Sequence, residues 1–179
     1  MLHAPAMLLI GSTERHLGKT GLVCALIRAL SPPHPVTAVK VSSPHQGPGA
    51  RPLDGPFRIT EETRPGRRKD TQRMLKAGAH QALWLEVVPA DLEAGAAALL
   101  ERIGTDTLTI CESNSLRTVL EPGLFLVLRG KAAEPVKASA QRVLDLADSL
   151  VAAGDGRFDL DLEGIAVVEG RWKLDASGG

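Results

Sequence analysis

The chain has 179 residues, of which 44% are hydrophobic and 23% charged, a composition typical of a globular domain and not of a disordered or fibrous chain. Its 21 basic and 21 acidic residues balance, so no overall field favours nucleic acid or an anionic membrane surface as a partner. We therefore expect one domain over residues 1–179. Because no apolar run approaches the length of a membrane span and the N-terminus lacks the features of a signal peptide, we also expect a cytoplasmic location.

A polar segment near the N-terminus has the character of a phosphate-binding loop. It follows an apolar run at residues 7–10, a predicted strand, and precedes a helix that is predicted to begin at Lys19 and to extend to Leu30. In such loops the backbone N–H groups and the positive end of the helix bind phosphate oxygens, the lysine reaches the outer phosphates, and the following threonine ligates Mg²⁺. The predicted nucleotide-binding residues are Thr13, Glu14, Arg15, His16, Leu17, Gly18, Lys19 and Thr20.

One position of this segment departs from the phosphate-loop consensus Gly-x-x-x-x-Gly-Lys-Ser/Thr. Counted back from Gly18, the first glycine is replaced by Thr13, and Gly11 comes two residues too early. The alternative is an ordinary turn between strand and helix, in which Gly18 only permits the bend and Lys19 is solvated. Because that alternative leaves the long polar segment unexplained, we favour a phosphate loop.

A second strand is predicted at residues 36–41, and Lys40 lies at its carboxyl end. Ligands of open α/β sheets gather just outside the carboxyl ends of the strands. Lys40 is therefore expected on the same rim as the phosphate loop. The alternative is a solvated lysine at the start of the next loop.

Residues 42–69 are predicted to form a long mobile loop. The segment has no periodicity, contains five prolines and four glycines, and ends in the basic residues Arg64, Arg67, Arg68 and Lys69. Loops of this length are usually lids, binding loops or flexible insertions. The cations could steer an anionic substrate, or they could be solvated charges of an insertion.

The remainder of the chain alternates helices and strands. A short helix is predicted from Asp70, a potential N-cap, to the left-handed stop at Gly78. The other predicted elements are strands at 81–88, 107–112 and 124–128, helices at 92–103 and 135–151, a terminal strand or hairpin at 165–174 and a loose tail at 175–179. The helix at 135–151 has the clearest apolar spacing. This alternation predicts an α/β fold with three layers, in which helices cover both faces of a mainly parallel sheet.

The strand at 107–112 ends in Glu112, which is a candidate ligand of the magnesium shell. A carboxylate directly after a buried strand occupies the place of the second metal-binding motif of phosphate-loop proteins. A single acidic residue at a strand end is common, however, and the alternative is a carboxylate without a role in metal binding.

The order of these motifs resembles that of the molybdopterin-guanine dinucleotide biosynthesis accessory protein B family. The resemblance rests on the phosphate loop, Val39-Lys40, a proline-rich gap, Lys69-Asp70-Thr71 and Ala77-Gly78-Ala79. It implies a P-loop NTPase fold and a nucleotide, commonly GTP. The implied role is assistance with the last nucleotide-attachment step of molybdenum cofactor assembly, with a nucleotidyltransferase or a molybdenum enzyme as partner.

The layout is also similar, more distantly, to dethiobiotin synthetase, an ATP-dependent ligase whose loop reads Thr-Glu before Gly-Lys-Thr. This resemblance implies that Lys19 and Thr20 hold phosphates and metal, and that Lys40 is catalytic with Lys19 because it contacts the transferring phosphate or the substrate. Both resemblances imply the same Mg²⁺ ligands: Thr20, Asp70 and Glu112.

Several features of function stay open at the level of sequence. The guanine-reading motif Asn-Lys-x-Asp is absent, so GTP and ATP are not distinguished. No residue stands out as a base that activates water, which indicates slow or partner-dependent hydrolysis. A nonhydrolysing nucleotide-binding module is a third alternative, and a homodimer is one option for the oligomeric state.

Overall fold

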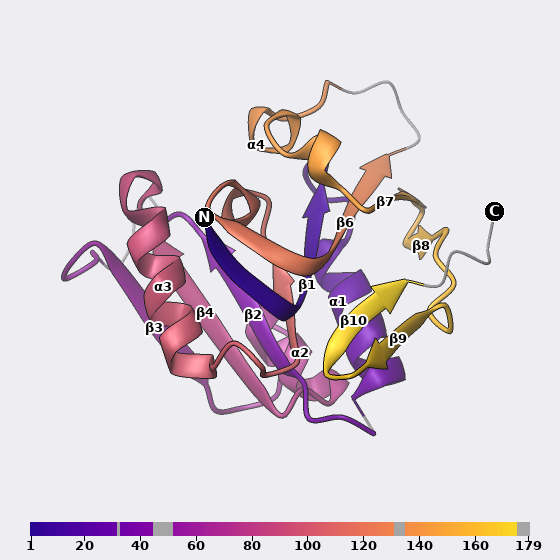
Figure 1. The fold of residues 1–179 in the computed structure, drawn as a ribbon, viewed down its shortest axis with the longest axis horizontal. Helices are drawn as coiled ribbons and strands as arrows, with labels where there is room; N and C mark the ends of the chain where they lie inside the picture. The colour runs from indigo at the N-terminus through magenta and orange to yellow at the C-terminus, as the bar shows by residue number, and fades with distance from the viewer. Residues whose placement is uncertain (32, 45–51, 131–134, 175–179) are drawn as a thin grey trace.

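An eight-stranded sheet forms the centre of the protein (Figure 1). The structure is a computed structural model that describes residues 1–31, 33–44, 52–130 and 135–174. The sheet order is β3-β4-β2-β5-β1-β6-β7-β8, in which the six inner strands are parallel and the two edge strands are antiparallel to their neighbours. The strands are β1 (Leu2–Ser12), β2 (Thr37–Ser42), β3 (Phe57–Glu62), β4 (Gln81–Val87), β5 (Thr109–Glu112), β6 (Leu120–Gly130), β7 (Ser149–Gly154) and β8 (Arg157–Phe158).

Helices cover both faces of the sheet, which confirms the predicted three-layer α/β fold. On one face α1 (Lys19–Leu30) and α2 (Asp70–Ala77) share a hydrophobic core with the hairpin of β9 (Ile165–Val168) and β10 (Arg171–Leu174). On the other face α3 (Leu92–Ile103) lies over a second core. The inner strands are buried on both sides because each face is covered. In the described ranges, none of the helices is long and apolar enough to cross a membrane.

The prediction of a helix at residues 135–151 was wrong. Only α4 (Ala138–Gln141) and a 3₁₀ turn at Leu144–Leu146 are helical, and the chain then enters β7. The backbone of β6 decides this outcome, because Asp148 accepts a hydrogen bond from the Phe125 N–H through its carboxylate and donates its own N–H to the Phe125 carbonyl. The helical spacing of apolar residues competed with an alternation in which Val151 and Ala153 are buried, and sheet pairing prevailed.

The prediction that residues 42–69 lack secondary structure was also wrong. Residues 57–62 form β3, which pairs with β4 at the edge of the sheet and places Phe57 and Ile59 against the second core. Arg58 on β3 forms an ion pair with the buried Glu86 on β4, at 2.7 Å. Residues 45–51 of this predicted mobile loop, and the predicted loose tail at 175–179, lie outside the described residues.

Candidate functional site

The register of the three central strands brings the predicted site residues to one edge of the sheet. Lys40 on β2 is paired with Glu112 on β5, and Glu112 is in turn paired with Ile10 on β1. Two residues after Ile10, β1 ends at Ser12, and the predicted phosphate loop leads from there to Lys19, the first residue of α1. Residues that are separated by 30 to 100 positions in the chain therefore become neighbours because parallel strands end at the same rim.

The backbone of the loop explains why Thr13 can replace the consensus glycine. Among the described non-glycine residues of the loop, only His16 has a positive φ (62°), and Gly18 has a φ of 85°. Thr13 is buried and donates its N–H to the Leu128 carbonyl at 2.8 Å, so it continues the pairing of β1 with β6. A β-carbon is compatible with that conformation, and a glycine is needed only at Gly18.

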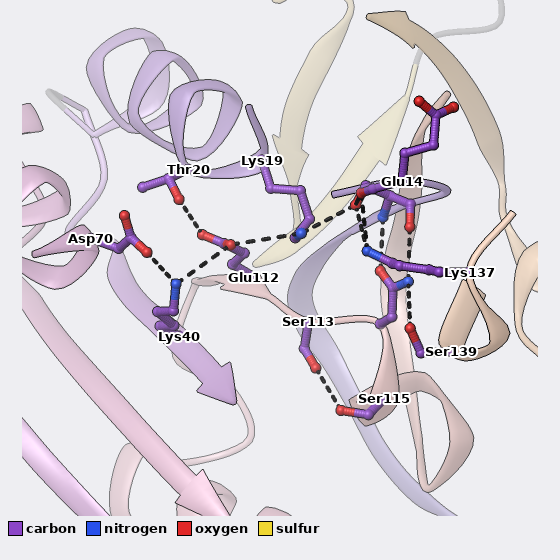
Figure 2. Close-up of polar contacts among 12 residues, drawn as sticks. Glu14, Lys19, Thr20, Lys40, Asp70, Glu112, Ser113, Ser115, Lys137 and Ser139 are labelled. Carbon is purple, nitrogen blue, oxygen red and sulfur yellow. Dashed lines mark hydrogen bonds and ion pairs between the residues drawn. The ribbon is translucent and has the colours of Figure 1, made fainter. Parts of the chain in front are cut away.

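Lys19, Thr20 and Glu112 form the centre of the site (Figure 2). The Thr20 hydroxyl donates a hydrogen bond of 2.7 Å to Glu112 Oε2, and Lys19 Nζ lies 3.9 Å from Glu112 Oε1. Glu112 is only 7% exposed, so its charge is poorly hydrated and depends on these neighbours. The arrangement holds an ammonium group and a hydroxyl at the start of α1, where the helix dipole also favours an anion.

Lys40 links the two predicted acidic ligands. Its Nζ forms an ion pair with Asp70 Oδ2 and lies 3.8 Å from Glu112 Oε1. Arg73 adds a second contact to Asp70, at 3.4 Å. Burial alone raises the pKa of the Asp70 carboxyl, but the Lys40 and Arg73 charges outweigh this effect, and the net pKa is lower than usual.

Asp70 does not act as the N-cap of α2, which was the alternative to a role in metal binding. The N-cap of α2 is Lys69, no side chain caps the helix, and Asp70 is the first helical residue. Its carboxylate therefore faces Lys40 instead of the free N–H groups of the helix. The predicted stop at Gly78 is confirmed, with a φ of 111°.

The donor atoms at this edge fit Mg²⁺. In the described part of the chain, no group of three or more histidine, cysteine, aspartate or glutamate side chains is placed to hold a metal alone. Mg²⁺ does not require such a cage, because it usually takes one or two carboxylates together with waters and substrate phosphates. Asp70 and Glu112 already converge on one cationic atom, Lys40 Nζ, and Thr20 adds a hydroxyl beside Glu112.

Three residues of the site were not singled out from the sequence: Ser12, Asn114 and Lys137. Asn114 pairs with the backbone of Ser12 in both directions, accepting from its N–H at 2.8 Å and donating to its carbonyl at 2.9 Å. The Ser12 hydroxyl accepts hydrogen bonds from Lys19 at 3.1 Å and from Lys137 at 2.9 Å. No pattern in the sequence marked Lys137, because it lies within the segment wrongly predicted as a helix at residues 135–151.

Lys137 lies close to the ammonium group of Lys19, and its pKa is lower than usual. Burial disfavours the charged form and the Lys19 ammonium repels it, so the pKa of Lys137 falls from 10.5 to about 8. Arg15 adds a smaller repulsion, whereas Glu112 acts in the opposite direction. The charged lysine is therefore held in this position at a cost in stability.

This cost predicts that Lys137→Met raises the free energy of unfolding of the protein, with no ligand added, by about 1 kcal/mol near pH 7. The effect is small because partial exposure screens much of the repulsion. Between pH 8 and 10.5 the folded wild type binds fewer protons than the unfolded chain, so wild-type stability should rise with pH across that window. Urea unfolding at several pH values measures both effects. A variant that is less stable than wild type near neutral pH, or that keeps the full rise with pH, would contradict the prediction.

Two cavities meet at the cluster of charged side chains. A cavity of about 970 Å³ lies along the loop and the start of α1, and a second of about 470 Å³ is lined by residues at the end of β2 and by residues 112–115. Four residues line both cavities: Lys19, Lys40, Glu112 and Lys137. We call the cavity of about 970 Å³ the loop cavity and the cavity of about 470 Å³ the second cavity. The volume of each lies within the range of small-molecule sites.

The other predicted residues lie around this centre in different ways. Arg15, His16, Leu17 and Gly18 line the loop cavity. Thr13 and Glu14 are buried, and Glu14 takes part through its carbonyl, which accepts from Lys137 Nζ at 3.2 Å. The basic residues at the end of the segment 42–69 are exposed and line neither of the two cavities: Arg64, Arg67, Arg68 and Lys69.

Comparison of the chain with protein-family models, with curated proteins and with solved structures found no match.

Proposed function

We propose that the chain is a magnesium-dependent nucleotide-binding protein that hydrolyses a nucleoside triphosphate slowly. One observation carries this proposal: five residues predicted for that role come from four separate elements and lie in one network of contacts, Lys19 and Thr20 on α1, Lys40 on β2, Asp70 on α2 and Glu112 on β5. An ordinary turn with a solvated lysine has no reason to gather two lysines and two acids at one rim.

The proposed mechanism is electrostatic positioning. Lys19 and Lys40 neutralise charge on the phosphates in the loop cavity, and the start of α1 adds its dipole. Thr20, Asp70 and Glu112 would hold Mg²⁺, which would neutralise part of the phosphate charge. Lys40 forms an ion pair with Asp70 in this structure, so binding of the phosphates requires Lys40 to exchange a carboxylate for a phosphate oxygen.

The proposed nucleotide and biological role rest on the order of motifs. The resemblance to the molybdopterin-guanine dinucleotide accessory family supports GTP and assistance in molybdenum cofactor biosynthesis, and the cytoplasmic location is the one expected from the sequence. In that role the protein would associate with a nucleotidyltransferase or a molybdenum enzyme. Slow intrinsic hydrolysis suits such a role, because a partner can supply the group that orients the attacking water.

Titration with fluorescent GTP and ATP, each with and without Mg²⁺, tests the proposal. We expect micromolar or tighter binding that requires Mg²⁺, and slow release of phosphate from the nucleotide that binds. Failure of both nucleotides to bind would overturn the proposal. Binding without any phosphate release, alone or with a nucleotidyltransferase added, would favour a nonhydrolysing binding module.

The second cavity supports a second candidate function, a small-molecule ligase of the dethiobiotin synthetase type. This cavity shares the four charged residues with the loop cavity. Its lining also includes polar and apolar side chains: Ser42, Ser113, Asn114, Ser115, Ser139, Val87 and Leu92. A small acceptor there would face the outer phosphates. Stimulation of ATP turnover by small amines or carboxylates, in the absence of any protein partner, would favour this candidate over the accessory role.

A further inference from the structure

Lys137 belongs to the phosphate site although it is 118 positions from Lys19 in the chain. Its Nζ donates to Ser12 Oγ at 2.9 Å and to the Glu14 carbonyl at 3.2 Å, and Lys19 Nζ donates to the same Ser12 oxygen at 3.1 Å. Figure 2 shows Lys19, at the start of α1, and Lys137, in the segment before α4, pointing toward each other. Two ammonium groups are thus held by one neutral hydroxyl, which balances neither charge.

Backbone contacts fix Lys137 against the loop. Its own N–H donates to the Thr13 carbonyl at 2.9 Å, and the next turn is held by Asn114, whose amide donates to Ser139 at 3.4 Å as well as to Ser12. The lysine is therefore placed by the main chain and not by a flexible stem alone. Such preorganisation of a cation is what binding of a phosphate group requires.

The position of Lys137 indicates which phosphate it would meet. The lysine at the end of a phosphate-binding loop, here Lys19, reaches the outer phosphates of a nucleotide. Lys137 and Lys19 both donate hydrogen bonds to the Ser12 hydroxyl. Lys137 also lines both the loop cavity and the second cavity. A nucleotide whose other phosphates extend along the loop would place its terminal phosphate between the two cavities.

We propose that Lys137 contacts the terminal phosphate together with Lys19, and that this contact makes the protein prefer nucleoside triphosphates to diphosphates. The inference rests on the proposed function, since it needs a nucleotide in the loop cavity. Lys137 then serves to distinguish the state before hydrolysis from the state after it. A charge-assisted hydrogen bond to a phosphate oxygen, present only with the triphosphate, supplies the difference.

The test compares the affinities of triphosphate and diphosphate in the intact chain. Fluorescent GTP, GDP, ATP and ADP are titrated with Mg²⁺ into wild type, Lys137→Met, Lys137→Gln and the control Lys76→Met, an exposed lysine near the end of α2. We expect both Lys137 variants to bind triphosphate about 10- to 30-fold more weakly and diphosphate less than about threefold more weakly. The control should match wild type.

Two results would overturn the inference and leave the proposed function standing: an equal loss for triphosphate and diphosphate, or a wild-type preference for triphosphate in both variants. Failure of the wild type to bind any of the nucleotides would overturn both proposals. Lys137→Gln keeps a donor for Ser12 without the charge, so wild-type behaviour of this variant alone would show that the charge is not what is recognised. Thermal melts confirm that each variant is folded.

Discussion

Replacement of Lys19 by methionine should weaken the binding of Mg²⁺-nucleotide by about 100-fold, which corresponds to roughly 3 kcal/mol. Lys19 is the first residue of α1, and its ammonium lies between Ser12 Oγ, at 3.1 Å, and Glu112 Oε1, at 3.9 Å. In that position it would bind the outer phosphates with charge-assisted hydrogen bonds. Methionine keeps much of the apolar stem and removes the charge, so the loss should be one of binding and not of folding. Titration with fluorescent GTP and ATP measures it.

The matched control for Lys19 is Lys76→Met on α2, which removes an exposed lysine that lines neither cavity. Its affinity should equal that of the wild type. If Lys19→Met binds nucleotide as tightly as the wild type does, the segment between β1 and α1 is an ordinary turn, and the proposed function fails with it.

Glu112→Gln should raise the Mg²⁺ concentration needed for half-maximal nucleotide binding by about tenfold or more. Glu112 is buried, accepts a hydrogen bond from Thr20 at 2.7 Å, and lies within 3.9 Å of both Lys19 and Lys40. Glutamine conserves the volume and can still accept from Thr20, but it no longer supplies a negative charge to the cation. Mg²⁺ titration at a fixed nucleotide concentration measures the shift.

Two further variants complete this experiment. Asp70→Asn should shift the Mg²⁺ dependence in the same direction as Glu112→Gln, and by less, because Asp70 is more exposed. Glu86→Gln removes another buried glutamate, one that pairs with Arg58 on β3 and lines neither cavity. It should lower stability and leave the Mg²⁺ dependence unchanged. An unaltered Mg²⁺ dependence in folded Glu112→Gln would remove the metal site from the proposal.

Local patterns were sufficient for most elements of the fold. The bounds of α1 and of the β9–β10 hairpin agree with the predictions, because a run of apolar residues at helical spacing and a Glu-Gly turn each act over a few residues. One prediction failed where two patterns overlapped. Residues 149–151 belong both to the predicted helix and to the strand alternation of β7, and pairing with β6 decides between them. The other failed at β3, which has no clear pattern of its own and forms by pairing with β4.

Some residues of the site could likewise be predicted from the sequence, and others could not. Lys19, Thr20, Lys40 and Glu112 could be named from the sequence, because each lies at the end of a recognisable strand or the start of a helix, and parallel strands bring those ends to one rim. Asp70 was named as a potential N-cap and as a metal ligand, and the structure excludes only the N-cap, because Lys69 takes that position and Asp70 pairs with Lys40. Lys137 lies in a segment whose predicted structure was wrong, so its place could not be inferred.

By itself, the sequence determined the layered α/β fold, the strand, loop and helix at the N-terminus, and the carboxyl ends at which charged residues would gather. These depend on interactions between residues that are close in the chain or on the uniform direction of parallel strands. Only the tertiary structure decided that Lys137 and Asn114 bind Ser12, and that residues 149–154 extend the sheet. Such contacts join segments about 20 to 125 residues apart, and their energies depend on which surfaces are already in place when the segments meet.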